Sequence, residues 1–313
     1  MDPSMSGPAL AALGEDLFVL SIRPRDGKLL IRGRIDAALM ASDLIRLAAA
    51  GRAQLAKGRI AVRDRTPTGD GELDAALLSL TGAAFPPRPE TWVGLPRPGI
   101  RHAYATRLIS AGVLRTESRR LLGTSRYPVA APARVAVARS RLDAVTDSSP
   151  PSGGLAEAAL AGLASAIGLG TALYPGREGR IRRARMAQIA RQQVIAHVTA
   201  RTGGGSDLVV PASAVAGPAD PEAAANLLRE TGTAAGGDPA LLASTEEAIA
   251  AAVHAVTAVI EGGAAFSSQV LGAHDRGGHG AGSHGGDGHH DGAHGSGGRG
   301  DGGHWTIGGF SHH

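Results

Sequence analysis

Hydrophobic positions recur every three or four residues over several stretches of the chain, and this spacing predicts helices. The pattern at residues 13–22 fits either a helix or a strand. Gly51 and Gly112 each follow an apolar stretch of helical spacing, a position where glycine commonly ends a helix. The expected helices cover residues 36–50, 72–80, 100–111, 155–174, 177–201 and 241–260.

Strands are expected only as short pieces beside turns. Lys57-Gly58 separates residues 52–55 from 59–62 and predicts a β-hairpin. A second hairpin is expected from residues 113–114 and 121–122, and a strand from residues 28–31. The prolines between residues 85 and 99 predict a stretch without regular structure. Residues 142–154 are polar and are interpreted as a connection.

Composition sets the domain organisation. The 313 residues are 43% hydrophobic and only 3% aromatic, and small residues dominate, which favours close helix packing. We therefore predict a mainly α fold, a single globular domain over residues 13–262 with short β-hairpins and a loop insertion at about 203–238. Residues 1–12 are expected to be disordered. The tail, residues 263–313, is also expected to be disordered, because Gly and His dominate it and little apolar surface is available for burial.

Residues 155–174 are apolar and close in length to a membrane span. They are rich in Ala and Gly rather than Leu, Ile, Val and Phe, so we interpret them as a buried core helix. The N-terminus lacks the basic start and long apolar core of a signal peptide. The chain has no cysteine, which excludes disulfides and cysteine metal sites and is compatible with a reducing cytoplasm.

A tight turn is predicted between the hairpin and the next helix. Pro67 fixes φ there, Gly69 permits a positive φ, and Thr and Asp side chains can bond to nearby amides. Asp70 or Gly71 then caps the helix that carries Leu73. By itself this stretch is a strand–turn–helix corner without chemistry.

The same stretch carries a family resemblance. Thr66-Pro67-Thr68-Gly69-Asp70, followed by Leu73-Asp74-Ala75-Ala76-Leu77, resembles the signature of the Golgi phosphoprotein 3 family of peripheral membrane proteins. Residues 13–17, 47–55 and 108–114 resemble further family segments, in the same order. The Ala-, Gly- and Arg-rich usage suggests a bacterial source with a GC-rich genome.

The resemblance implies a lipid site. Eukaryotic members recognise phosphatidylinositol 4-phosphate through one Trp and three Arg, and link the Golgi membrane to glycosyltransferase tails. Here the Trp position falls on Ile31, and two Arg positions fall on Met40 and Pro98. These replacements weaken headgroup specificity but leave a basic surface suited to anionic lipid. The residues expected to bind lipid are Arg32, Arg34, Arg97 and Arg101, of which Arg101 matches directly and Arg97 substitutes beside Pro98.

Catalytic motifs are lacking: the sequence has no phosphate-binding loop, His-Glu-x-x-His or Gly-x-Ser-x-Gly, and outside the tail its only histidines are His102, His197 and His254. We expect no enzyme activity and no cofactor. The tail histidines could bind metals such as Ni, Zn or Cu weakly, without a defined four-ligand site. These candidate ligands are His279, His284, His289, His290 and His294.

The expected function is that of a non-enzymatic, peripheral membrane protein at the cytoplasmic face, on the Golgi only if the source is eukaryotic. Its partners would be an anionic phospholipid or phosphoinositide surface and the tails of membrane enzymes. Two alternatives remain open. The repeated order of helix, Gly, strand, turn and strand also suits a winged-helix nucleic-acid-binding protein, and a protein-interaction module without lipid binding is the other.

Overall fold

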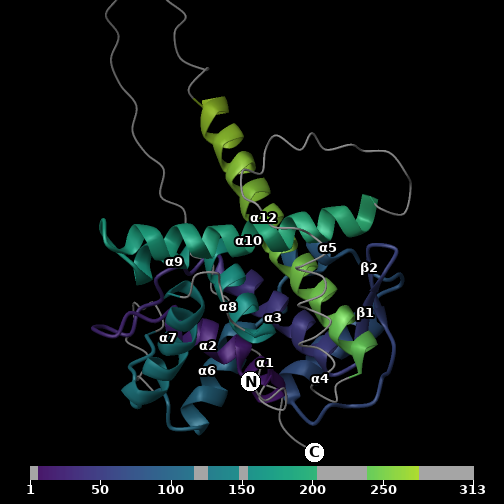
Figure 1. The fold of residues 1–313 in the computed structure, drawn as a ribbon, viewed down its shortest axis with the longest axis horizontal. Helices are drawn as coiled ribbons and strands as arrows, with labels where there is room; N and C mark the ends of the chain where they lie inside the picture. The colour runs from purple at the N-terminus through teal and green to yellow at the C-terminus, as the bar shows by residue number, and fades with distance from the viewer. Residues whose placement is uncertain (1–5, 116–125, 148–153, 203–237, 275–313) are drawn as a thin grey trace, which may run out of the picture. The chain divides into compact units, whose positions relative to one another are not determined.

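The computed structural model of the protein describes residues 6–115, 126–147, 154–202 and 238–274. Over these residues the chain is mainly helical, with one two-stranded antiparallel hairpin (Figure 1). The prediction of a mainly α fold is therefore confirmed. The helices are α1 Ser6–Ala11, α2 Leu13–Leu20, α3 Ile35–Ala49, α4 Gly71–Thr81, α5 Pro89–Gly94, α6 Ile100–Ser110, α7 Pro132–Asp147, α8 Leu155–Ala166, α9 Leu169–Leu173, α10 Gly179–Thr202 and α12 Pro239–His274.

Helix α3 lies at the centre of the packing. Its residues from Ile35 to Ala48 are almost all buried, and helices α1, α2, α4, α5, α6 and α8 contact it. A helix that is apolar on all sides has to be enclosed in this way. The polar residues that α3 does bury, Asp43 and Arg46, therefore need partners inside the protein.

The hairpin forms where the sequence predicts it. Strands β1, Ala53–Ala56, and β2, Arg59–Val62, pair antiparallel, with Ala56 opposite Arg59. Lys57 and Gly58 have φ angles of 52° and 69°, which is the geometry of the tight hairpin turn that favours glycine. The second predicted hairpin is different: Leu114 forms an isolated bridge with Val129, and residues 121–122 lie outside the described residues.

The predicted core helix at residues 155–174 is buried but divided in two. Helix α8 buries Leu160 and Leu163 completely, and Gly168, with a φ of 77°, separates it from α9. A left-handed residue ends an α-helix, so the apolar stretch does not continue as one long helix. Its burial confirms the interpretation as core.

Helix α12 is the one helix among the described residues whose length and apolar composition would suffice to cross a membrane, over Pro239–Gly262. Half of that segment's apolar window is buried inside the protein. Val253 and Val256 are fully buried, and Val253 packs against Gly162 of α8. These contacts are those of a helix that belongs to the protein core.

Two predictions of irregular structure are wrong, one for residues 1–12 and one for the proline-rich residues 85–99. Helix α1 occupies half of residues 1–12, and its Leu10 is buried in the hydrophobic core, because α1 packs against α3 and α8. Helix α5 forms within the proline-rich stretch. Pro89 is its first residue, the one helical position where the missing N–H costs nothing, and Trp92 is buried.

One further helix was not predicted, and another is longer than predicted. Helix α7 runs to Asp147 through the supposed connection, because its polar face is paired with other charged groups while Leu142 and Val145 are buried. Helix α12 continues to His274 rather than ending near residue 260, because the Gly-rich composition begins only at Gly272. The prediction of a disordered tail over residues 263–313 is therefore wrong for residues 263–274, which are helical. The predicted loop at about 203–238, except for residue 238, and the tail from residue 275 lie outside the described residues.

The basic helix α10 is not simply a solvated face. Arg182 binds Asp147 through both Nε and Nη2, at 2.7 Å each, and Arg183 donates to the carbonyl oxygens of Tyr174 and Gly176. The guanidinium of Arg139 lies 4.0 Å from the centre of the Tyr174 ring. Part of the positive charge of α10 therefore serves to hold it to α7 and α9.

Candidate anion-binding site

The turn before α4 is held by its own side chains. The amide and hydroxyl of Thr68 both donate to Asp74 Oδ1, at 2.6 and 2.7 Å, and Gly69 has a φ of 80° as predicted. Asp70 caps α4 by accepting hydrogen bonds from the amides of Glu72 and Leu73. The residues that carry the family resemblance thus shape the corner between β2 and α4.

Asp70 also joins three helices. Its Oδ2 accepts hydrogen bonds from Arg46 of α3 and Arg107 of α6, both at 2.5 Å. Partial burial alone would raise the pKa of Asp70, but the hydrogen bond from Arg107 and the charges of both arginines outweigh it and lower the pKa to about 2. This carboxylate is therefore ionised under all ordinary conditions and fixes α6 against α3 and α4.

A second carboxylate, Asp43, lies fully buried in the middle of the same network. It accepts hydrogen bonds from the hydroxyl of Tyr104 and from Arg97, both at 2.6 Å, and Arg46 approaches to 3.4 Å. Burial raises the pKa of Asp43 to about 6, although Tyr104 and the two arginines act in the opposite direction. A charge buried this deeply needs such partners, so these contacts are structural.

Arg97 belongs to this network rather than to the surface. Its side chain is only 15% exposed, and it binds Glu72 at 3.4 Å in addition to Asp43. Both carboxylates are distant in sequence, so the pairing could not be anticipated. The guanidinium is directed toward the interior, where it holds the segment before α6 in place.

The other three predicted lipid-binding residues lie just before α3 or in the first turn of α6. Arg32 and Arg34 flank Gly33 in the turn before α3, and Arg34 is exposed at the position that caps this helix. Arg101, in the first turn of α6, binds Asp36 in the first turn of α3 at 2.7 Å. The N-terminal ends of both helices therefore lie together. We name the surface formed by Arg32, Arg34 and Arg101 the basic edge.

The electrostatics of the basic edge favour anions. Each helix presents the positive end of its dipole at its N-terminus, although the amides of Ile35 and Ile100 already donate to the carbonyl oxygens of Ile31 and Arg97. Asp36 offsets part of this charge; burial raises its pKa, while the charge and hydrogen bond of Arg101 lower it. Arg34 reaches the carbonyl oxygen of Ile167 at 3.5 Å, so the junction of α8 and α9 borders the same edge.

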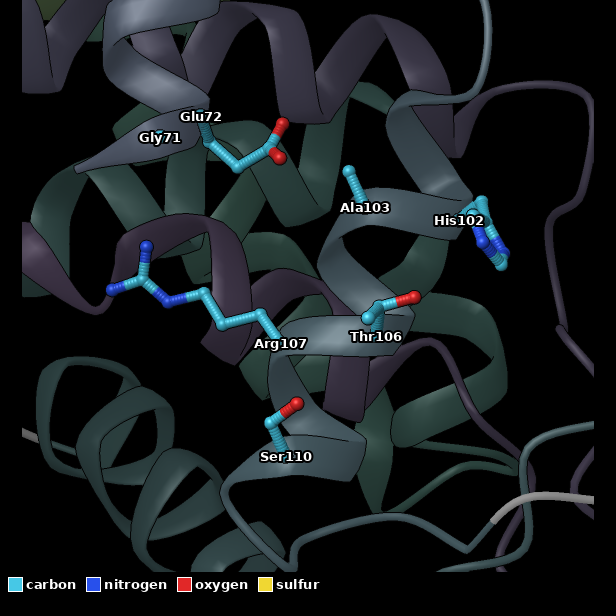
Figure 2. A pocket seen from close by; sticks show the side chains of 7 residues that line it. All are labelled: Gly71, Glu72, His102, Ala103, Thr106, Arg107 and Ser110. Carbon is cyan, nitrogen blue, oxygen red and sulfur yellow. The ribbon is translucent and has the colours of Figure 1, made fainter.

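A shallow hollow of about 440 Å³ lies farther along α6, between this helix and the start of α4 (Figure 2). Glu72 reaches over it, while His102 points away from Glu72 and from Arg107. The guanidinium of Arg107 is neutralised by Glu15 and Asp70, at 2.6 and 2.5 Å. With Glu72 as a further negative charge, the hollow is a poor place for a phosphate. Its lining consists of Gly71, Glu72, His102, Ala103, Thr106, Arg107 and Ser110.

The histidines predicted to bind metal in the tail, His279, His284, His289, His290 and His294, lie outside the described residues. The structure instead brings together two histidines of the folded body that the sequence shows far apart. His197 and His254 lie beside Glu90, with one potential ligand atom from each residue within 4.8 Å of the others. No periodicity or motif in the sequence indicates this cluster, since its members come from three separate helices.

Comparison with known protein families identifies the family of this chain. Residues 13–202 match the family described as Golgi phosphoprotein 3 (GPP34), which is more than half of the chain. The match ends at the last described residue of α10 and includes both the turn before α4 and the basic edge. No curated protein matches the chain.

Proposed function

Because the chain belongs to the Golgi phosphoprotein 3 family, which is not a family of enzymes, we propose that it acts as a peripheral membrane protein. It binds anionic phospholipid headgroups through the basic edge, at the cytoplasmic face of a membrane. The observation that carries this proposal is the ion pair of Arg101 with Asp36, which brings the first turns of α6 and α3 together beside the exposed Arg34.

Phosphate oxygens suit this surface for two reasons. Arginine presents several N–H donors in a planar fork that matches a phosphate, and helix N-termini add backbone donors and positive potential. Arg34 is exposed and Arg101 remains 40% exposed despite its bond to Asp36, so both guanidinium groups can reach a headgroup. Arg97 supports this site indirectly, because its ion pairs fix the start of α6.

The positions that differ from the family's lipid pocket bear on selectivity. Met40, where the resemblance expects an Arg, is fully buried and cannot contact a headgroup. Ile31, at the Trp position, is half-buried and lacks an aromatic ring for the membrane interface. We therefore expect binding to depend on the charge of the surface more than on phosphatidylinositol 4-phosphate itself. An adaptor role toward the tails of membrane enzymes would follow from such membrane attachment.

Nucleic-acid binding receives less support. In a winged helix, the cations of helix α6 would have to face a DNA groove and its phosphates. Arg107, in the last turn of α6, is paired with Glu15 and Asp70, and Glu72 lines the hollow beside the same helix. These carboxylates would repel a DNA backbone that followed α6 beyond Arg101.

Co-sedimentation with liposomes tests the lipid proposal. Each basic residue near an anionic bilayer contributes about 1 kcal/mol, so Arg34→Ala combined with Arg101→Ala should weaken binding by about thirtyfold. The matched control is Arg180→Ala with Arg191→Ala, which removes the same charge from exposed positions of α10. Binding should fall as salt rises, and neutral liposomes should not bind.

The control distinguishes binding through the basic edge from binding that depends only on the total positive charge of the protein. Equal weakening by both double variants would show that total positive charge, and not this surface, determines binding. Equal binding of the wild type and the Arg34→Ala/Arg101→Ala variant would remove the basic edge from consideration. Affinity for duplex DNA with a steeper salt dependence than lipid binding would favour the nucleic-acid alternative.

A further inference from the structure

Helices α5, α10 and α12 meet at a group of three side chains that the lipid proposal does not use. Glu90 lies in the first turn of α5, His197 near the end of α10 and His254 in the middle of α12. Figure 1 shows α12 crossing α10, with α5 beside the crossing. Two imidazoles and one carboxylate thus come together from segments more than 50 residues apart in sequence.

The distances are close to those of a metal site. His254 Nδ1 lies 3.2 Å from Glu90 Oε1, and the centres of the two imidazole rings are 5.1 Å apart. Ligand atoms around a tetrahedral Zn²⁺ are about 3.4 Å apart, given metal–ligand distances of about 2.1 Å. The pair formed by His254 and Glu90 already has this spacing. The full set spans at most 4.8 Å, so side-chain rotation would complete the site.

Close helix packing holds the three residues in reach of one another. A Cβ at Gly94, one turn after Glu90, would lie 3.3 Å from Val259 Cγ2, five residues after His254. At Gly162 of α8, a Cβ would lie 3.0 Å from Val253 and would collide with Gln193 of α10. Gln193 is one turn before His197 and donates to the carbonyl oxygen of Ala158. Glycine therefore lets these helices approach, and the cluster rests on a fixed framework.

We propose that Glu90, His197 and His254 form a binding site for a divalent transition metal of the Zn²⁺ type. Imidazole nitrogen and carboxylate oxygen are ligands that Zn²⁺ accepts, and two His with one Glu is a known three-ligand set. His197 is only 2% exposed, whereas Glu90 and His254 remain 24% and 27% exposed. Metal would enter from the side of Glu90 and His254, and water would fill the fourth position.

The bound metal would join the C-terminal helix α12 to α5 and α10. A metal that binds only the folded state stabilises the protein against unfolding, since the unfolded chain does not hold the three ligands together. Stabilisation distinguishes metal bound at this cluster from metal bound by the histidines after residue 275. The histidines after residue 275 could also bind metal, but they are not part of the cluster. The test therefore has to separate metal bound at the cluster from metal bound by these histidines.

Thermal unfolding of the full-length protein, stripped with a chelator and titrated with Zn²⁺, provides the test. At a metal concentration one hundredfold above Kd, the wild-type melting temperature should rise by about 5–10 °C. His197→Asn with His254→Asn should abolish this rise. His289→Asn with His290→Asn removes the same number of imidazoles from the tail and should retain it. With Co²⁺, the wild type should give the visible absorption of a tetrahedral site, and the body variant should not.

Glu90→Gln is the second variant, in case loss of both histidines prevents folding. It retains the size of the side chain but has no charged oxygen, so the folded variant should show a smaller metal-dependent rise. A full rise in this variant and in the His197→Asn/His254→Asn variant would overturn the proposal. The absence of any rise in the wild type, or its loss only in the tail variant, would do the same.

Discussion

Asp70 shows how much of the candidate site depends on single side chains. One carboxylate caps α4 and also binds Arg46 and Arg107, so a change here affects a helix start and two ion pairs together. The sequence predicted the cap, because a helix start is recognised from residues that are neighbours in the sequence. It did not predict the arginine partners, because those contacts depend on the packing of α3 and α6.

Gly69 offers a test of the turn at the scale of one residue. Its φ is 80° and a Cβ would meet no atom within 4 Å, so the cost of a side chain comes from backbone conformation alone. We expect Gly69→Ala to lower the free energy of unfolding by about 1–2 kcal/mol, measured by denaturant titration. Gly71→Ala, two residues later, is the control: Gly71 also has open space around it, but no positive φ, and should lose no stability.

At the scale of elements, local signals identified the helices that begin or end with a distinctive residue. Gly51 follows α3 with a φ of 68°, and the Lys57-Gly58 hairpin and the start of α4 also lie where predicted. Helices α5 and α7 were missed. Pro89 resembles a helix breaker unless its position in the first turn is known. Helix α7 carries many arginines, and their acidic partners become visible only after folding.

The crossing of α2 and α6 depends on Gly14. A Cβ at this position would collide with the ring and hydroxyl of Tyr104, which is fully buried and hydrogen-bonded to Asp43. Gly14→Ala should therefore cost about 1–3 kcal/mol of unfolding free energy through overpacking. Gly162→Ala is a suitable comparison because both glycines lie inside helices and gain equally in helix propensity.

The comparison depends on which neighbour has to move. The methyl group that Gly162→Ala adds would meet Val253 Cγ2 at 3.0 Å and the amide end of Gln193, whose amide can rotate away without moving the helix. At Gly14 the added methyl group would lie within 2.6 Å of three atoms of the fully buried Tyr104 side chain. Melting curves of the two variants should show the larger loss for Gly14→Ala. A loss below about 1 kcal/mol for Gly14→Ala, no larger than that of Gly162→Ala, would mean that Tyr104 can move aside, and that its bond to Asp43 does not fix the α2–α6 crossing.

At the scale of the whole molecule, the candidate site is a product of long-range charge pairing. The sequence identified Arg32, Arg34, Arg97 and Arg101 as one group, and composition alone gave no reason to separate them. The fold separates Arg97 from the other three, because Asp43 and Glu72 bind it from α3 and α4. The same limit applies to Glu90, His197 and His254, whose proximity results from the packing of α5, α10 and α12.

This charge pairing predicts how acid affects the whole protein. Asp70 has a pKa of about 2 in the folded state and about 3.9 when unfolded, so its pairing stabilises the protein above pH 4. As pH falls through the folded pKa, the carboxylate takes up a proton and this stabilisation is lost. Between pH 5 and pH 2.5, the loss attributable to Asp70 should be about 1.5 kcal/mol.

Comparison with Asp70→Asn isolates this contribution, since the other titrating groups are shared by both proteins. The asparagine can still cap α4 but carries no charge for Arg46 and Arg107. The difference in unfolding free energy between wild type and variant, measured in denaturant at each pH, should be constant above pH 5. It should become smaller as the pH falls from 5 to 2.5. A gap between wild type and Asp70→Asn that does not change with pH would show that the ion pairs of Asp70 do not stabilise the folded protein.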